Sequence, residues 1–379
     1  MTRRVAIVGA ALSDTGTVSG TSLQLIQQAS ARALTDSGLS KDEIDGFAGH
    51  GTLLPPVEVT EYLGIRPTWG DSTNVGGSSW ELMAQHAVAA IERGEAEVVL
   101  IAYGSTARSD VKQRRRTAVT PMTASGPLQF EAPYGHPLIA KYAMAARRHM
   151  HEYGTTIEQL AEIAVAARLH AANNPDAFYR DPITVDDVLS SRLIADPFTQ
   201  LHCCIRTDGG GAVILASEER ARDLARTPVY VLGSGQALSH VSMSQWTDFT
   251  ESPCVKSGAA AFGAAGVTPN DIDVWNLYDS FTYTVLATLE GLGVCGKGEG
   301  GDFVSDGRLR PGGSFALNPD GGGLSACHPG MRGIFLLVEA VRQLRGECGV
   351  RQVPDAATAA VNATGGFFSA TGTMILGRD

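Results

Sequence analysis

The chain has 379 residues, of which 44% are hydrophobic and 18% charged, and 44 are glycines. This composition is typical of a globular protein, and the length suggests two domains or one large double domain. The formal net charge is −10, and the only basic patch, Arg114–Arg116, is short and has no aromatic neighbours, which argues against nucleic acid as a partner.

Membrane and metal signals are weak as well. No stretch of about eighteen apolar residues occurs, so we predict no membrane span, and the first residues run directly into a strand-like segment rather than a signal peptide. None of the six cysteines has a Cys-x-x-Cys spacing, so neither a disulfide framework nor a zinc site is expected. We expect a cytoplasmic protein with reduced thiols, no metal site and no cofactor of its own.

The first hundred residues alternate between strand and helix patterns. Arg4–Ala10 predicts a buried strand, and residues 22–37 carry apolar side chains at helical spacing. A Gly/Ser turn at residues 74–80 opens a second helix, Glu81–Arg93, and Val98–Ala102 predicts another buried strand. This alternation indicates an α/β fold with a mostly parallel sheet that is covered by helices on both faces.

The pattern changes between about residues 105 and 197. This segment holds the basic patch, a Pro/Gly-rich stretch and two helical patterns, at residues 140–153 and 157–173. Long excursions of this kind usually carry function as lids or binding loops. We therefore predict an inserted loop region that packs over the core.

The second half of the chain repeats features of the first in the same order. VYVLGSG from Val229 matches VAIVGAA from Val5, GVTPNDIDVW matches GLSKDEIDGF, and LRGE matches ERGE. Any single match is weak and has chance similarity as its alternative, but an ordered set indicates a duplicated unit. We predict an N-terminal half, residues 1–227, that includes the inserted region of about 105–197, and a C-terminal half, residues 228–379.

The stretch Gly321–Gly333 (GGGLSACHPGMRG) is the strongest candidate for a functional centre. It brings glycines, Cys327 and His328 to the start of an apolar run, Ile334–Val341, which predicts a buried helix. Glycines allow close backbone approach, and a helix N-terminus favours negative charge. A tight turn around a core histidine is the alternative. The repeat places an equivalent helix after GGSSW, so two helix N-termini would face one crevice and stabilise an anion there.

These motifs resemble the thiolase superfamily, specifically its sterol-carrier and lipid-transfer-protein type. The family's Gly-His-Pro turn corresponds to Cys327-His328-Pro329, and its Asn-Glu-Ala-Phe or His-Asp-Cys-Phe motif to Tyr278-Asp279-Ser280-Phe281. The glycine-rich C-terminal loop corresponds to Asn362–Gly366. The resemblance covers essentially the whole chain. It implies a duplicated, five-layered α-β-α-β-α fold and a homodimer.

The chain departs from the family at the nucleophile. A thiolase attacks its acyl group with a cysteine at the start of the first-half helix, where this chain has Val75, and the second family cysteine falls at about Ala363. Without them, the covalent acyl-enzyme route is not expected. Cys327, next to His328 at a helix start, is a candidate for a relocated nucleophile. Ser78 is a weaker one, because a serine there more often caps the helix.

The family pocket binds a CoA thioester and stabilises its enolate. We predict retro-aldol cleavage of a β-hydroxyacyl-CoA, which needs a base and an enolate site but no nucleophile. The catalytic candidates are Tyr278 as base or proton relay, His328 at the enolate, Asp279 as an orienting group, and Cys327. The resemblance implies that substrate contacts come from the glycine loops, at Gly76, Gly77, Ser78, Gly322, Gly323, Gly365 and Gly366.

Members of this type that lack the nucleophilic cysteine and carry a YDSFT-like segment are aldolases for CoA thioesters of steroid side chains. They bind a small partner with an OB fold and a zinc ribbon, which would supply the only zinc. Those aldolases have a tyrosine-containing turn where this chain has Cys327-His328-Pro329. Two alternatives therefore stay open, a thiolase or acyltransferase that uses Cys327 and a non-catalytic carrier of lipid or acyl-CoA. Phe130, Tyr134 and Phe178 are expected to line the acyl channel.

Overall fold

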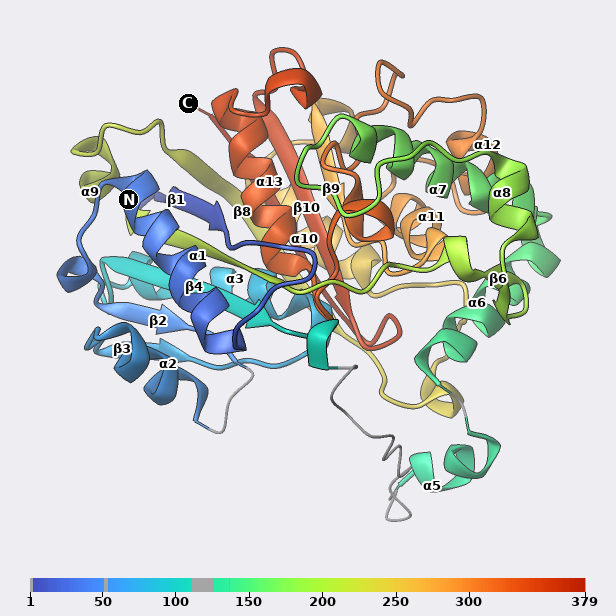
Figure 1. The fold of residues 1–379 in the computed structure, drawn as a ribbon, viewed down its shortest axis with the longest axis horizontal. Helices are drawn as coiled ribbons and strands as arrows, with labels where there is room; N and C mark the ends of the chain where they lie inside the picture. Colours follow the sequence, from blue (N-terminus) through green and yellow to red (C-terminus); the bar gives the residue numbers. More distant parts are fainter. Residues whose placement is uncertain (1–2, 51–53, 111–125, 136, 379) are drawn as a thin grey trace.

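The computed structural model describes residues 3–50, 54–110, 126–135 and 137–378 (Figure 1). The basic patch Arg114–Arg116 and most of the Pro/Gly-rich stretch lie outside the described residues.

The first half supplies the strands and helices that the sequence pattern predicts. Helix α1 illustrates why they form, because Thr21 caps its start together with Gln24, and Gly38, with φ of 78°, ends it in the left-handed conformation. The elements are β1 (Val5–Leu12), α1 (Ser22–Ser37), β2 (Gly46–Ala48), α2 (Pro55–Leu63), β3 (Trp69–Asp71), α3 (Ser79–Glu92), β4 (Val98–Ser105), β7 (Gly209–Ser217) and α9 (Glu218–Arg222).

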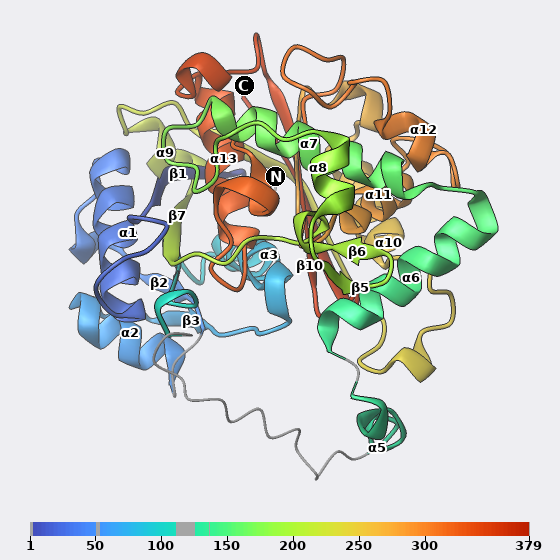
Figure 2. The same ribbon diagram turned by 45° about the vertical axis from the view of Figure 1, so that its right-hand side comes forward.

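The inserted region is mostly helical and contains the predicted helix pair. Its elements are α5 (Leu128–Glu131), α6 (Leu138–Tyr153), α7 (Ile157–Ala172), α8 (Val185–Ser190), β5 (Leu193–Ala195) and β6 (Phe198–Thr199). Figure 2 shows α6, α7 and α8 beside α11 and α12, which belong to the second half. Phe130 and Tyr134 are 71% and 77% exposed, so the structure does not place them in an enclosed acyl channel.

The second half repeats the strand and helix pattern. Its elements are β8 (Val229–Leu238), α10 (Cys254–Ala265), β9 (Val274–Leu277), α11 (Thr282–Gly291), α12 (Gly300–Val304), α13 (Gly333–Arg345), β10 (Thr358–Gly365) and β11 (Ala370–Gly377). None of the helices in the described ranges combines the length and apolarity needed to cross a lipid bilayer.

Nine of the described strands form one sheet in the order β3-β2-β4-β7-β1-β8-β11-β10-β9, and β5 and β6 pair separately. Counted outward from the β1–β8 contact, the first half contributes β1, β7 and β4, and the second half contributes β8, β11 and β10. In both halves the first strand is followed by the last strand of the half in this sheet and then by the strand before it. This matching order supports the predicted duplication. The boundary at residues 227 and 228 falls between α9 and β8 and stays a prediction.

The prediction of a mostly parallel sheet is wrong. Within the described chain, only β2–β3, β2–β4 and β9–β10 pair in parallel, and the remaining neighbours are antiparallel. Two connections explain the difference. A tight hairpin joins β10 to β11, which makes these strands antiparallel. The inserted region contains helices, but it returns the chain into β7 antiparallel to β4, so it is not the crossover that parallel strands require.

Alternating side chains of the strands divide the core into layers. On β1, Ala6 and Val8 pack with α1, whereas Val5 and Ile7 pack with α3 and α13. In the second half, Val361 faces the same central helices, and Ala360 faces α10 and α11. The two halves of the sheet therefore enclose α3 and α13 between them and carry outer helices on their other faces. This confirms the five-layered α/β fold.

Candidate active site

The structure brings Tyr278 and His328 together. Tyr278 directly follows β9, and its backbone N–H donates to the carbonyl of Asn362 on β10 (2.9 Å). His328 lies in the turn before α13, and its Nε2 is 3.0 Å from Tyr278 Oη. The two rings are nearly perpendicular (88°), and only 5% of Tyr278 and 7% of His328 is exposed. Two motifs that are 50 positions apart therefore form one buried pair.

Burial decides the protonation of this pair. It holds the pKa of the Tyr278 phenol well above its usual range, and burial together with Arg332 lowers the pKa of His328 to about 4. At neutral pH the phenol keeps its proton and the imidazole is uncharged, and the tautomer of His328 decides which of the two donates in their hydrogen bond. A free phenolate base is not what the structure provides. Tyr278 instead suits a relay in which it receives one proton as it passes another to His328.

Asp279 is bound by the protein itself. Its carboxylate accepts from the backbone N–H groups of Gly323 (2.7 Å) and Leu324 (3.0 Å), and it lies 3.6 Å from Nε of Arg332. Burial raises its pKa to about 6, although Arg332 lowers it. A Cβ atom on Gly322 would overlap the carboxylate. The glycines Gly322 and Gly323 therefore close around Asp279 in this structure, and the carboxylate fixes the turn that carries His328.

Arg332 connects this carboxylate to the rest of the turn. Its side chain is fully buried and donates to the carbonyl of Cys327 (2.7 Å) and to Asp320 (2.5 Å). Asp320 in turn accepts from the backbone N–H of Gly322 (2.9 Å). The Arg332 guanidinium therefore binds two buried carboxylates and the carbonyl of Cys327, which directly precedes His328.

Cys327 is not an activated thiol. Its Sγ lies 3.1 Å from Oγ1 of Thr207 and packs in the apolar core. Burial raises the pKa of its thiol to about 12. Cys327 also lies six residues before the start of α13, so the structure gives its thiol neither the helix start nor the solvent access that would favour a thiolate.

The two glycine loops pack directly against Tyr278 and against each other. A Cβ atom on Gly77 would lie 2.5 Å from the Tyr278 ring, and one on Gly365 would overlap the carbonyl of Val75. Gly76, with φ of 82°, would place a Cβ atom 3.0 Å from the backbone nitrogen of Gly366. Because only glycine permits these approaches, the loops fix the position of the phenol.

The serines at the start of α3 bond to the backbone. The hydroxyl of Ser78 donates to the carbonyl of Ala370 (3.3 Å), and that of Ser79 donates to the carbonyl of Gly76 (2.6 Å). Neither hydroxyl has a histidine partner in the described chain, so neither has the base that a serine nucleophile needs.

A cavity of about 590 Å³ opens beside these loops. Its walls include Gly76 and Gly366, and two exposed apolar side chains, Leu238 and Val241, lie at its edge. His240 also lines it, stacks on Trp246 (4.6 Å) and leaves its buried Nε2 without a hydrogen-bond partner in the described chain. Neither Tyr278 nor His328 lines this cavity, but Gly76, which does, directly precedes the glycine that packs under the Tyr278 ring.

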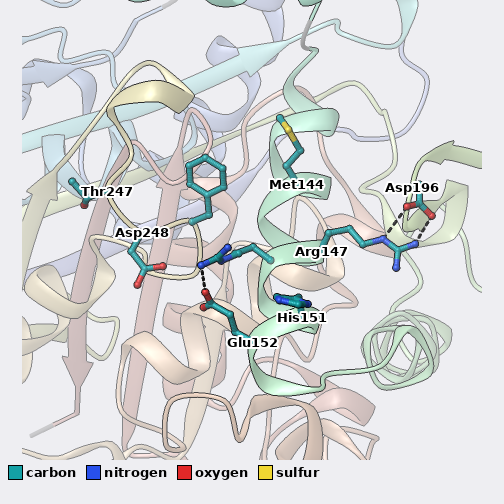
Figure 3. A pocket seen from close by; sticks show the side chains of 9 residues that line it. Met144, Arg147, His151, Glu152, Asp196, Thr247 and Asp248 are labelled. Atoms are coloured by element: carbon teal, nitrogen blue, oxygen red, sulfur yellow. Dashed lines mark hydrogen bonds and ion pairs between the residues drawn. The ribbon is translucent and has the colours of Figure 1, made fainter.

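A larger cavity, of about 880 Å³, lies along α6 (Figure 3). Four of its charged residues form two ion pairs, Arg147 with Asp196 and Arg148 with Glu152, each at 2.5 Å. None of the residues predicted for the site lines it. We therefore do not assign the reaction to this cavity.

Sequence reasoning missed three residues of this centre, namely Glu81, Thr207 and Arg332. Arg332 lies inside the predicted motif, but a lone arginine gives no sign that it will bind two carboxylates from other segments. Glu81 looks like an ordinary acidic residue in the first turn of a helix. The one available signal was its position within the apolar α3 sequence.

Comparisons with known proteins identify the family of the chain. Residues 235–378 match the Thiolase C-terminal domain-like family. An acetyl-CoA acetyltransferase of Methanothermobacter thermautotrophicus is 34% identical over 99% of this chain and 100% of its own. A 17-hydroxy-3-oxo-4-pregnene-20-carboxyl-CoA lyase of Mycobacterium tuberculosis is 37% identical over 90% and 92%.

A solved Ltp2-ChsH2(DUF35) aldolase has the same fold. Its TM-score is 0.89 at 33% identity, and the match covers 99% of this chain and 98% of the other. The two relatives named above and this solved structure are all more than 30% identical to the chain and cover 90% or more of it. The chain therefore belongs to the thiolase superfamily, in its lipid-transfer-protein and sterol-carrier-protein-like branch.

Proposed function

We propose that this protein cleaves a β-hydroxyacyl-CoA by a retro-aldol reaction, with a steroid side chain as the acyl group. One observation carries the proposal. The buried phenol of Tyr278 is bonded to the neutral imidazole of His328 at 3.0 Å, while the start of α3 offers valine, glycine and serine in place of a nucleophilic cysteine.

The pair can move the protons that the reaction requires. The substrate β-hydroxyl gives its proton to Tyr278 Oη as Tyr278 gives its own to His328 Nε2. The electron pair of the O–H bond forms the second bond of the ketone C=O group. The electron pair of the broken Cα–Cβ bond passes into the thioester enolate. Cα then takes the proton back through the same pair. The products are a ketone and a shorter acyl-CoA, without an acyl-enzyme. The starts of α3 and α13 lie beside the pair and favour the enolate charge.

The substrate class follows from the relatives and from the cavity. The mycobacterial relative is named for a 17-hydroxy steroid carboxyl-CoA, which carries a β-hydroxyl. The cavity of about 590 Å³ beside Gly76 and Gly366 has the size and apolar edge that a rigid hydrocarbon ring system needs. We place the acyl group there.

A turnover experiment tests the proposal. The full chain, together with its small partner, is incubated with a branched β-hydroxyacyl-CoA, and the ketone and shortened acyl-CoA are measured by liquid chromatography with mass detection. We expect both products in equal amounts. A complex that turns over neither steroid nor aryl β-hydroxyacyl-CoAs would rule the function out.

An acyltransferase is the alternative, because one relative bears that name. Such a reaction needs a thiolate, and burial raises the pKa of all six cysteines. At the pKa of about 12 of Cys327, fewer than about one thiol in ten thousand is ionised at pH 7.5. We therefore expect no mass increase of the intact protein after treatment with acyl-CoA. An acyl adduct that disappears in Cys327→Ala would instead support the acyltransferase.

We also propose a small DUF35-type partner, a homodimer and a cytoplasmic location. The solved aldolase is a complex with such a partner. For the homodimer, strand β3 ends the sheet with a neighbour on one side only. For the location, all six cysteines are unpaired, as is usual in a reducing compartment. In the described ranges no three His, Cys, Asp or Glu side chains are grouped to hold a metal ion, and we place the zinc in the partner. Light scattering with and without the partner, and cell fractionation, test these points.

A further inference from the structure

Glu81 is a buried acid without a partner. It lies in the first turn of α3, only 1% of it is exposed, and neither carboxyl oxygen has a hydrogen bond within the described chain. An uncompensated carboxylate in a protein interior is strongly unfavourable, so such a group either holds a proton or serves a function that offsets its cost.

The carboxyl lies behind the reactive pair. A Cβ atom on Gly333 would be 2.5 Å from both Glu81 Oε2 and the carbonyl oxygen of Gly77. Gly333 begins α13, five residues after His328, and Gly77 packs against the ring of Tyr278. The Glu81 carboxyl is therefore wedged between the starts of the two central helices, on the backbone that supports both members of the pair.

We propose that Glu81 is a positioning residue of this site, which keeps its proton so that the positive ends of α3 and α13 act on the enolate alone. A carboxylate in this place would neutralise both helix starts and repel the enolate. The protonated acid also suits the carbonyl of Gly77, because it can donate to an oxygen that a carboxylate would repel. This inference rests on the proposed retro-aldol function.

The surroundings of Glu81 favour the neutral form. The groups around it are backbone of Gly77, of Gly333 on α13 and of Gly372 on β11, and the strands packed on α3 contribute apolar side chains. Among the titratable groups, Arg332 directly precedes Gly333 and is bound to Asp320 and Asp279, and the Tyr278 ring packs on Gly77. Burial raises the pKa of Glu81 to about 8, against a lowering by its own backbone N–H, and no charged group is among the causes.

The test compares pH profiles of Glu81→Gln and of the full-length parent. In the parent, kcat is expected to fall about tenfold per pH unit above pH 8, as Glu81 ionises. Glutamine keeps a donor but cannot ionise, so this fall is expected to be absent in the variant. Glu92→Gln, a change at an exposed position of the same helix, serves as the matched control and should keep the parental profile. Identical profiles for the parent and Glu81→Gln would overturn the inference.

Infrared spectroscopy gives a readout that needs no turnover. A buried protonated carboxyl has a carbonyl band that should be present at pH 7, weaken as the pH rises past 8, and be missing in Glu81→Gln. If the band is absent at pH 7, the inference fails even if the enzyme is active. If the parent cleaves no β-hydroxyacyl-CoA but shows the band, the proposed function fails instead.

Discussion

Tyr278→Phe is expected to lower kcat about a thousandfold, within the range of 10²–10⁴ that general acid–base catalysis contributes. The change removes only the hydroxyl that lies 3.0 Å from His328 Nε2, so the relay between substrate and imidazole is lost. The phenyl ring still fills the space against Gly77. We therefore expect KM for the acyl-CoA and the melting temperature to change little. Steady-state kinetics with the β-hydroxyacyl-CoA measure the effect.

Tyr283→Phe is the matched control. Tyr283 lies five residues further on, at 1% exposure, and its hydroxyl has no hydrogen-bond partner in the described chain. Removing an unpaired buried hydroxyl is neutral or slightly stabilising, so activity should be retained. Equal kcat values for Tyr278→Phe and the parent would contradict the relay. A cellular function that survives Tyr278→Phe and His328→Ala would support the non-catalytic carrier.

Arg332→Leu is expected to lower the free energy of unfolding by about 3–5 kcal/mol, the usual cost of removing one partner from a buried ion pair. Leucine fills part of the space but leaves Asp279 and Asp320 without their cation. The carbonyl of Cys327, next to His328, loses its donor at the same time. Urea unfolding followed by circular dichroism measures the loss.

The control is Arg310→Leu, at the half-exposed ion pair of Arg310 with Glu162. Exposed pairs contribute about 1 kcal/mol or less, so this variant should unfold close to the parent. An Arg332→Leu protein that is as stable as Arg310→Leu would show that the two buried carboxylates do not depend on Arg332.

The sequence was sufficient to predict several of the central elements and to single out Tyr278 and His328. Apolar residues at helical spacing and apolar runs located α1, α3 and α13. The similar segments GLSKDEIDGF and GVTPNDIDVW, together with the similar strands, indicated two similar halves. Tyr278 and His328 were singled out by their positions in segments that resemble thiolase motifs, and the structure places them within hydrogen-bonding distance.

Strand direction and protonation could not be predicted in the same way. A buried apolar run has the same composition in parallel and antiparallel pairing, so β7 and β11 gave no sign of their direction. Whether Cys327 ionises depends on how many apolar neighbours exclude water from it. Asp279 could not be recognised as a turn brace, because its partners come from a segment more than 40 residues away.

The position of β11 makes the continuity of the sheet depend on one strand. Residues 370–377 form the last described strand, yet they lie between β8 and β10 in the interior of the sheet. Without this strand, β8 and β10 would each present an unpaired edge in the middle of the sheet. Such edges favour aggregation, so loss of the β11 pairing is expected to make the protein prone to aggregate.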